Sequence, residues 1–187
     1  MKIKSLLKSN KACQSQKLFK ITKEEEGAIR QYKSSDAYKI NDSLRSIGYE
    51  NLPEDSKKQI DNISTGLRKL PKYDKILYRN VGLDSMRKFN GDEKAIEFIN
   101  EHRKGNIVTY DGFTSTSKSK DGYLIDEESQ ANIEIIKNKN GRDITGFPGV
   151  PGEDEVLFDR NSKFKILDSK WTKDYNKYRF IIKMEEL

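Results

Sequence analysis

Two glutamates late in the chain are the first residues whose type and spacing could do chemistry. Glu153 and Glu155 flank Asp154 and follow a segment rich in glycine and proline, residues 146–152. In an extended chain alternate side chains share a face, so Glu153 and Glu155 point the same way. Two carboxylates on one face could stabilise a cation and accept a proton. A solvated acidic loop end is the competing interpretation, and the loop before it, of a type often used for recognition, weighs against it.

A run of hydroxyl side chains, Phe113-Thr114-Ser115-Thr116-Ser117, offers a second group. On a strand, Phe113, Ser115 and Ser117 face the same way, which could aim Ser115 into a cleft. A hydroxyl there can hold a carboxylate or a substrate oxygen by a hydrogen bond. A serine–histidine–aspartate triad is excluded, because the chain has one histidine and no G-x-S-x-G turn. Taken alone, the segment is more typical of an edge strand rich in serine and threonine.

Arg79 is the third candidate, because it interrupts an apolar strand-like segment, residues 76–81. A guanidinium among apolar neighbours requires an anionic partner, which could be a buried carboxylate or a bound phosphate. A structural salt bridge is the usual explanation, so Arg79 alone indicates no function.

Several functions are excluded by what the sequence lacks. With one histidine, His102, and one cysteine, Cys13, it has no cluster for zinc and no internal disulfide. It also lacks the glycine spacings of a phosphate-binding loop and of a Rossmann fold. The sequence contains no run of about 18 apolar residues, so no membrane-spanning helix is predicted. We expect His102 to be structural, near a helix C-terminus.

The positive net charge is confined to the N-terminus. Of 36 basic side chains, seven are lysines within residues 1–23, which contain no acidic residue. The rest of the chain has 29 basic against 30 acidic side chains, a net charge of −1, which predicts no basic face for nucleic acid. We expect residues 1–21 to be a basic arm or leader and residues 22–187 to be a single domain. The arm could touch an anionic membrane without stable insertion, although a solvated linker is the simpler interpretation.

The elements that must position these residues are helices first and strands later. Thr22 and Glu25 form a capping-box pattern that opens the first helix. Helices are predicted at 22–32, 35–48, 53–71 and 92–103. Strands are predicted at 75–81, 106–110, 112–116, 132–137, 155–158, 163–168 and 177–184. This order predicts an α+β domain, with a mixed or antiparallel sheet.

Three features match, in chain order, the motifs of a known protein family: the arginine on a strand, the Ser-Thr-Ser strand and the Glu-x-Glu segment. The chain resembles the arginine–serine–glutamate class of mono-ADP-ribosyltransferases, and most of all the enzymatic domain of the clostridial binary actin-modifying toxins. The resemblance covers residues 22–184. Its motifs are the segments 29–32 (IRQY), 38–45 (YKINDSLR), 77–82 (LYRNVG), 112–117 (GFTSTS), 151–157 (PGEDEVL) and 163–166 (KFKI).

The resemblance implies a role for each candidate residue. Glu155 would bond the 2′-hydroxyl of the nicotinamide ribose and stabilise the cation formed as nicotinamide leaves, while Ser115 would orient Glu155. Arg79 would hold the phosphates of NAD. Glu153 is the position that accompanies arginine as the acceptor, and Phe147 would lie in the acceptor-recognition loop. The remaining implied NAD-binding residues are Tyr38, Asn41, Asn80, Gly112, Thr116 and Ser117.

The resemblance also implies the fold and the partners. It implies N-terminal helices packed on a mixed, mostly antiparallel two-sheet β core, with NAD as co-substrate and no metal. The partner would be a target protein, actin being the leading candidate, modified by a secreted or injected enzyme in a host cytosol. One departure is that residues 118–131 offer Lys118, Lys120 and Tyr123 but no arginine for the NAD phosphates. An NAD glycohydrolase and a non-enzymatic, basic-armed binding module remain the alternatives.

Overall fold

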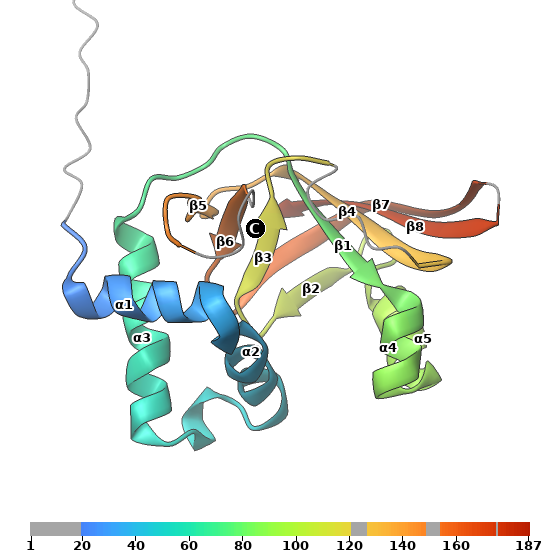
Figure 1. The fold of residues 1–187 in the computed structure, drawn as a ribbon. Coiled ribbons are helices and arrows are strands. Elements are labelled where there is room, and N and C mark those ends of the chain that lie inside the picture. Colours follow the sequence, from blue (N-terminus) through green and yellow to red (C-terminus); the bar gives the residue numbers. More distant parts are fainter. Residues whose placement is uncertain (1–19, 121–126, 149–153, 175) are drawn as a thin grey trace, which may run out of the picture.

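Helices form the N-terminal part of the computed structural model, which describes residues 20–120, 127–148, 154–174 and 176–187 (Figure 1). The capping box is confirmed: Glu25 N donates to Thr22 Oγ1 at 3.2 Å, and Thr22 N donates to Glu25 Oε2 at 2.8 Å. The helical elements are α1 (Lys23–Gln31), the π-helix η1 (Tyr32–Asp36), α2 (Ala37–Ser46), the 3-10 helix η2 (Tyr49–Asn51), α3 (Glu54–Lys69), α4 (Leu83–Asn90) and α5 (Asp92–Glu101).

The strands form one mixed sheet in the order β2-β7-β8-β4-β1-β3-β6-β5. β4 and β8 are parallel, and the other neighbouring pairs are antiparallel. The strands are β1 (Leu77–Gly82), β2 (Ile107–Tyr110), β3 (Thr114–Ser117), β4 (Ser129–Lys137), β5 (Arg142–Asp143), β6 (Glu155–Phe158), β7 (Ser162–Asp174) and β8 (Lys177–Glu186). The predicted α+β class, with N-terminal helices and a mostly antiparallel sheet, is confirmed.

The expected division into two sheets needs a correction. β1 pairs with β4 from Leu77 to Gly82, whereas it meets β3 at Tyr78 and Ser117. This contact joins β3, β6 and β5 to the other strands, so hydrogen bonds connect all eight strands into one sheet. The junction lies next to Arg79 and is therefore part of the candidate site.

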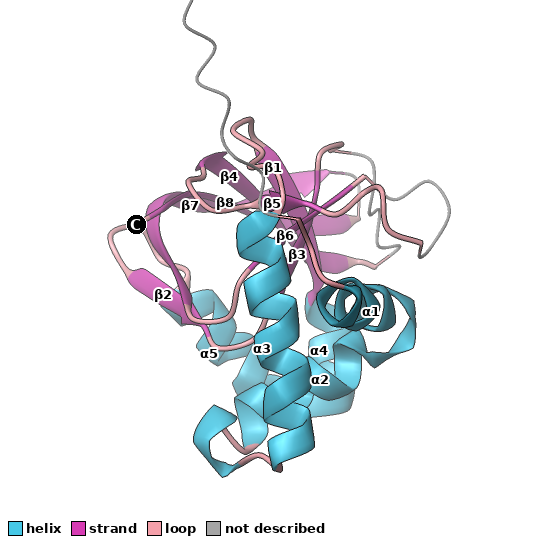
Figure 2. Ribbon diagram, turned by 90° about the vertical axis from the view of Figure 1, so that its left-hand side faces the viewer, coloured by secondary structure: helices cyan, strands magenta, loops and turns pink. Residues whose placement is uncertain are grey.

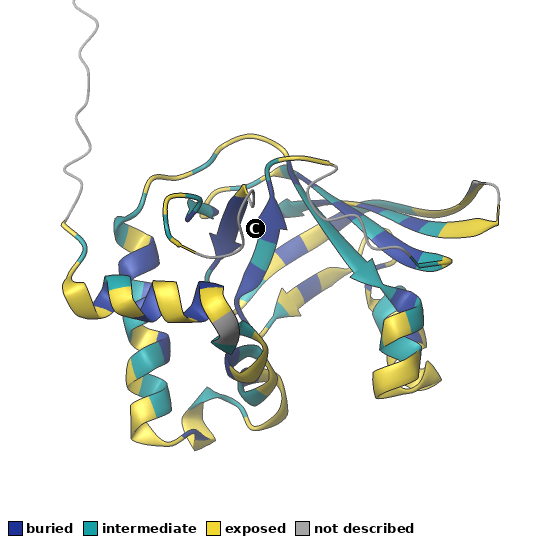
Figure 3. Ribbon diagram, in the orientation of Figure 1, coloured by how far each residue is buried: buried dark blue, intermediate teal, exposed yellow. Residues whose placement is uncertain are grey.

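Two apolar clusters hold the layers together. In one, α1, α2 and α3 bury residues such as Ile29, Ile63 and Leu67 against Leu157 of β6. In the other, α5 packs on the buried side chains of the long strands, among them Phe164. The first three helices lie at one end of the sheet and α4 and α5 at the other in Figure 1, and most of the helices lie below the strands in Figure 2. β3 and β6, between the clusters, are largely buried (Figure 3).

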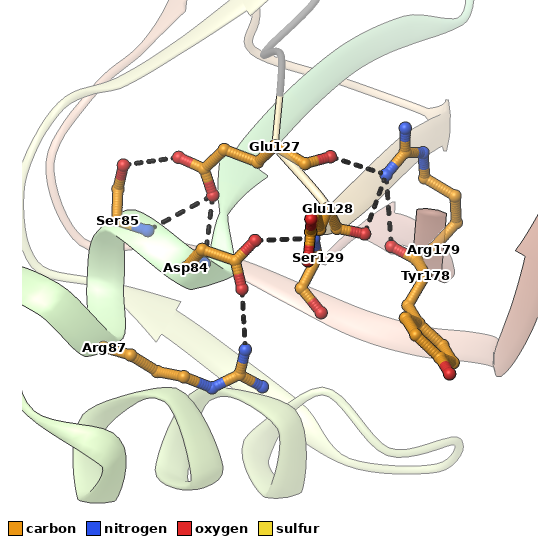
Figure 4. Close-up of polar contacts among 8 residues, drawn as sticks. All are labelled: Asp84, Ser85, Arg87, Glu127, Glu128, Ser129, Tyr178 and Arg179. Atoms are coloured by element: carbon orange, nitrogen blue, oxygen red, sulfur yellow. Dashed lines mark hydrogen bonds and ion pairs between the residues drawn. The ribbon is translucent and has the colours of Figure 1, made fainter. Parts of the chain in front are cut away.

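α4 is a helix that the sequence pattern did not predict, because its N-terminal cap comes from a distant part of the chain. Glu127 Oε2 accepts hydrogen bonds from Asp84 N at 3.0 Å and from Ser85 N at 3.2 Å, while Ser85 Oγ donates to Glu127 Oε1 (Figure 4). A Cβ on Gly82 would lie 2.2 Å from this carboxylate, so only glycine leaves room for the cap.

The same cluster fixes the chain that enters β4. Asp84 Oδ2 accepts from Ser129 N at 2.7 Å and its Oδ1 lies 2.9 Å from Arg87 Nη1. Arg179 of β8 donates to the carbonyl oxygen of Glu127 at 3.2 Å (Figure 4). The residues just before β4 are therefore tied both to α4 and to β8. These contacts also explain why β4 begins at Ser129, three residues before the predicted strand.

His102 is buried at the end of α5, as a structural residue would be. Its ring stacks on Phe98 with centroids 4.0 Å apart. Nδ1 lies 2.7 Å from the carbonyl oxygen of Phe98, and Nε2 lies 2.6 Å from the Tyr110 hydroxyl. Because a carbonyl oxygen only accepts, Nδ1 carries the proton and Nε2 accepts from Tyr110. Burial of this neutral ring lowers the pKa of His102 to about 4.

This burial predicts a pH dependence of stability. In the unfolded chain His102 takes up a proton near its ordinary pKa of 6.5, whereas in the folded protein its pKa is about 4. The free energy of unfolding therefore falls as the pH is lowered from about 6.5 to about 4. Between pH 7 and pH 5 the loss through His102 should be about 2 kcal/mol. Urea unfolding at both pH values should show that the free energy of unfolding falls by that much more in wild type than in His102→Gln. Equal losses in the two proteins would mean that His102 titrates as an exposed histidine does.

Candidate active site

Strand pairing brings together three of the predicted site residues. β3 and β6 are antiparallel, with Ser115 opposite Leu157 and Ser117 opposite Glu155. β1 meets β3 beside Arg79, at Tyr78. Arg79, Ser115 and Glu155 therefore come from adjacent strands, although 76 positions separate the first from the last in the sequence.

Ser115 and Glu155 form a direct hydrogen bond. Ser115 Oγ donates to Glu155 Oε1 at 2.6 Å, and the Glu155 residue is 8% exposed. A hydrogen bond to a carboxylate is stronger than one between neutral groups, and it fixes the orientation of the carboxylate. Next to this pair, Thr116 Oγ1 donates to the Val156 carbonyl at 2.7 Å, which further ties β3 to β6.

Arg79 is anchored through one of its donors. Its Nη1 donates to the carbonyl oxygen of Ser115 at 2.7 Å, so the guanidinium lies at the residue whose hydroxyl holds Glu155. Among the described residues no carboxylate forms an ion pair with Arg79 within 4.0 Å. Because a guanidinium has five N–H donors, Arg79 retains donors for an anion.

The helical wall of the site depends on Asn41. Its Oδ1 accepts from Phe113 N at 2.8 Å, and its Nδ2 donates to the Tyr32 hydroxyl at 3.0 Å. A Cβ on Gly112 would lie 2.7 Å from Asn41 Oδ1, so glycine allows α2 to approach the start of β3. Asn41 thus links α2 to the start of β3, and the sequence analysis predicted NAD-binding residues in both of these segments.

Tyr32 lies at the candidate site, although the sequence analysis placed it in a helical motif and gave it no role there. Its ring is buried and meets Phe113 edge-on, with centroids 5.4 Å apart. Burial raises the pKa of Tyr32 to about 12, opposed by the Asn41 hydrogen bond, and nearby Glu155 raises it further. Tyr32 and Asn41 are nine positions apart. In an unbroken α-helix such residues lie on opposite faces, so the π-helix after α1 and the change of direction bring them together.

Other predicted NAD-binding residues lie in varied surroundings. Tyr38 is 87% exposed on α2, without a contact to Ser115 or Glu155 among the hydrogen bonds of the described residues. Asn80 Oδ1 accepts from Asn132 Nδ2 at 2.6 Å. Ser117 Oγ accepts from Ser119 N at 3.0 Å, which shapes the chain leaving β3.

The segments that flank the predicted acceptor loop are partly described. Phe147 is half-buried against the apolar cluster of α1, α2 and α3. Glu153 and Tyr123 lie outside the described residues. Lys118, which the sequence offers in place of an arginine near the phosphates, donates to Asp143 Oδ2 at 2.8 Å and to Thr145 Oγ1 at 2.9 Å. Lys120 lies 3.5 Å from Glu134, so both lysines have carboxylate partners.

The arrangement can bind an anion and stabilise a cation on neighbouring strands. Arg79 supplies free donors, and the buried Glu155 carboxylate supplies a fixed negative charge. In the described part of the chain, no three histidine, cysteine, aspartate or glutamate side chains cluster as metal ligands would. Nor does any helix within those residues have the length and apolarity needed to cross a membrane.

Two comparisons concern the sequence. Residues 7–187 match the family model of the ADP-ribosyltransferase exoenzyme domain. A protein of Mycobacterium avium named NAD(+)–arginine ADP-ribosyltransferase Mav is 27% identical over 162 residues, which cover 85% of this chain and 17% of that protein. A Vibrio splendidus protein of the same name, Vis, is 25% identical over 167 residues, covering 83% of this chain and 63% of that one. The chain therefore spans less than two thirds of either relative.

Solved structures agree with the fold. The ADP-ribosyltransferase toxin Plx2a from Paenibacillus larvae has a TM-score of 0.71 at 22% identity, covering 89% of this chain and 87% of that one. The enzymatic component C2-I of the Clostridium botulinum C2-toxin has a TM-score of 0.67 at 27% identity, covering 90% of this chain and 44% of that one. Because the family model matches nearly the whole chain and the fold is shared, this protein belongs to the ADP-ribosyltransferase exoenzyme family.

Proposed function

We propose that this chain transfers ADP-ribose from NAD to an arginine side chain of a target protein. The observation that carries the proposal is the buried Glu155 carboxylate, oriented by Ser115 beside the strand of Arg79. Membership of the ADP-ribosyltransferase exoenzyme family supports NAD as co-substrate. The names of the Mav and Vis relatives support arginine as the acceptor. Residues 22–187 are the proposed catalytic domain, and residues 1–21 a basic arm.

The reaction moves a positive charge from the nicotinamide ring to one carbon atom of the ribose. The bond between C1′ of the ribose and the nicotinamide nitrogen breaks, its electron pair leaves with nicotinamide, and the ribose becomes a cation. The Glu155 carboxylate stabilises this cation and bonds the ribose 2′-hydroxyl. A guanidinium nitrogen of the acceptor then bonds to C1′ and gives its proton to Glu153. Arg79 binds the phosphates, because a guanidinium matches their oxygen pairs.

Actin is the proposed target and a host cytosol the proposed place of action. The support is the resemblance of the motifs to the actin-modifying toxins, together with the likeness to C2-I at 27% identity. The delivery is proposed to be secretion or injection. Labelled NAD added to a eukaryotic lysate tests these points. An arginine-linked label on a band that runs with actin supports them, and a label only on other proteins contradicts actin as the target.

Glu155→Gln should lower both nicotinamide release and label transfer by about 100-fold, because it removes the charge that stabilises the cation. The matched control is Asp154→Asn, which removes a charge from the neighbouring exposed position and should leave both activities near wild type. Single-turnover nicotinamide release and autoradiography of the lysate provide the two measurements. Wild-type rates in Glu155→Gln would exclude Glu155 from the reaction.

Glu153→Gln should separate transfer from NAD cleavage. Arginine modification should fall by about 100-fold, since the protonated guanidinium has lost its proton acceptor. Nicotinamide release without acceptor should persist, because Glu155 remains. The assay compares modification of a small guanidinium compound such as agmatine with hydrolysis of NAD. If arginine modification survived, the role given to Glu153 would be wrong; nicotinamide release without any transfer by wild type would instead favour an NAD glycohydrolase.

A further inference from the structure

Lys33, on the π-helix η1, is a buried cation that the proposed reaction does not use. The residue is 8% exposed, and its ammonium donates to the carbonyl oxygens of Ile144 at 3.3 Å and Phe147 at 3.2 Å. Among the described residues no carboxylate lies within 4.0 Å of Lys33. Burying an ammonium group is costly unless it is hydrogen-bonded, so these two carbonyls are what keep Lys33 in place.

The two carbonyls belong to one tight turn. Phe147 N donates to the carbonyl oxygen of Ile144 at 3.0 Å, and this hydrogen bond closes the turn. The Lys33 ammonium, from the helical side, donates to the carbonyl oxygens of both residues. More than 100 positions separate Lys33 from these residues, as the separations of 111 and 114 show. Lys33 therefore fixes the position of the turn relative to η1.

The turn is also bonded to the strand that carries Glu155. Ile144 N donates to the Glu155 carbonyl at 3.1 Å. Lys118, which follows β3, donates to Asp143 and Thr145, and its own N–H donates to the Asp154 carbonyl at 3.0 Å. The turn is thus held by Lys33 from the helices, and its neighbouring residues are held by Lys118 from the sheet. It shares a backbone hydrogen bond with Glu155.

Lys33 is adjacent in sequence to Tyr32, whose hydroxyl accepts a hydrogen bond from Asn41 on the proposed NAD side of the site. The short π-helix thus carries one side chain toward the NAD side of the site and one toward the turn of Phe147. Because π-helical turns are frequent at functional sites, this placement agrees with a functional role for the segment.

We propose that Lys33 is a positioning residue for the acceptor: it holds the turn that carries Phe147, and so determines how a protein arginine is presented. This inference rests on the proposed arginine transfer. The Lys33 ammonium bonds the turn and neither Ser115 nor Glu155, so we expect its effect to fall mainly on the acceptor.

The test uses Lys33→Met, which keeps most of the side-chain length and removes the ammonium. The KM for the protein acceptor should rise about tenfold or more, since small displacements of reacting groups have large effects on rate. Nicotinamide release without acceptor should stay within about twofold of wild type, because NAD cleavage needs no acceptor. Lys33→Arg, which keeps a charged donor, should recover part of the acceptor affinity. The matched control is Lys39→Met, at an exposed lysine of the next helix, which should change neither value.

Three results would overturn the role of Lys33 alone: equal losses of transfer and nicotinamide release, no loss of either, or no rescue by Lys33→Arg. Thermal unfolding monitors the fold of each variant. If Lys33→Met did not fold, Lys33→Gln would replace it, because its amide can donate to one carbonyl. Failure of both to fold would make Lys33 a residue of stability and not of positioning. A wild-type protein without arginine transfer would instead contradict the proposed function itself.

Discussion

A buried carboxylate requires a hydrogen-bond donor, and Ser115 of the neighbouring strand β3 donates to Glu155 of β6. Most of the site follows from it. Ser115 can reach Glu155 because β3 and β6 pair in one register, and Arg79 reaches the Ser115 carbonyl because β1 meets β3 at the same place. A shift of one residue in either pairing would turn these side chains to the other face of the sheet.

The helices complete the site by close packing against the start of β3. Asn41 hydrogen-bonds the backbone of Phe113, and Gly112 leaves the space that this contact requires. The π-helix between α1 and α2 turns Tyr32 toward Asn41 and Lys33 toward the turn of Phe147. One short irregular segment therefore connects the proposed NAD side of the site with the proposed acceptor side.

Local patterns in the sequence were sufficient for most of the helices and strands and for the strand motifs. The capping box of Thr22 and Glu25, the apolar periodicity of α3 and the hydroxyl run of β3 all act over a few residues, and each is recovered in the structure. Contacts between distant residues could not be found in this way. The cap that Glu127 gives α4, the hydrogen bond between Tyr32 and Asn41, and the ion pair between Lys118 and Asp143 all depend on the folded chain.

The most direct test of the central claim is a crystal structure of the protein with an NAD analogue whose nicotinamide is joined to the ribose by an uncleavable carbon–carbon bond. The account predicts the 2′-hydroxyl of that ribose within hydrogen-bond distance of the Glu155 carboxylate, and a phosphate oxygen within ion-pair distance of Arg79. An analogue bound with its ribose away from Glu155, or bound elsewhere on the protein, would contradict the claim that these strands form the NAD-cleaving site.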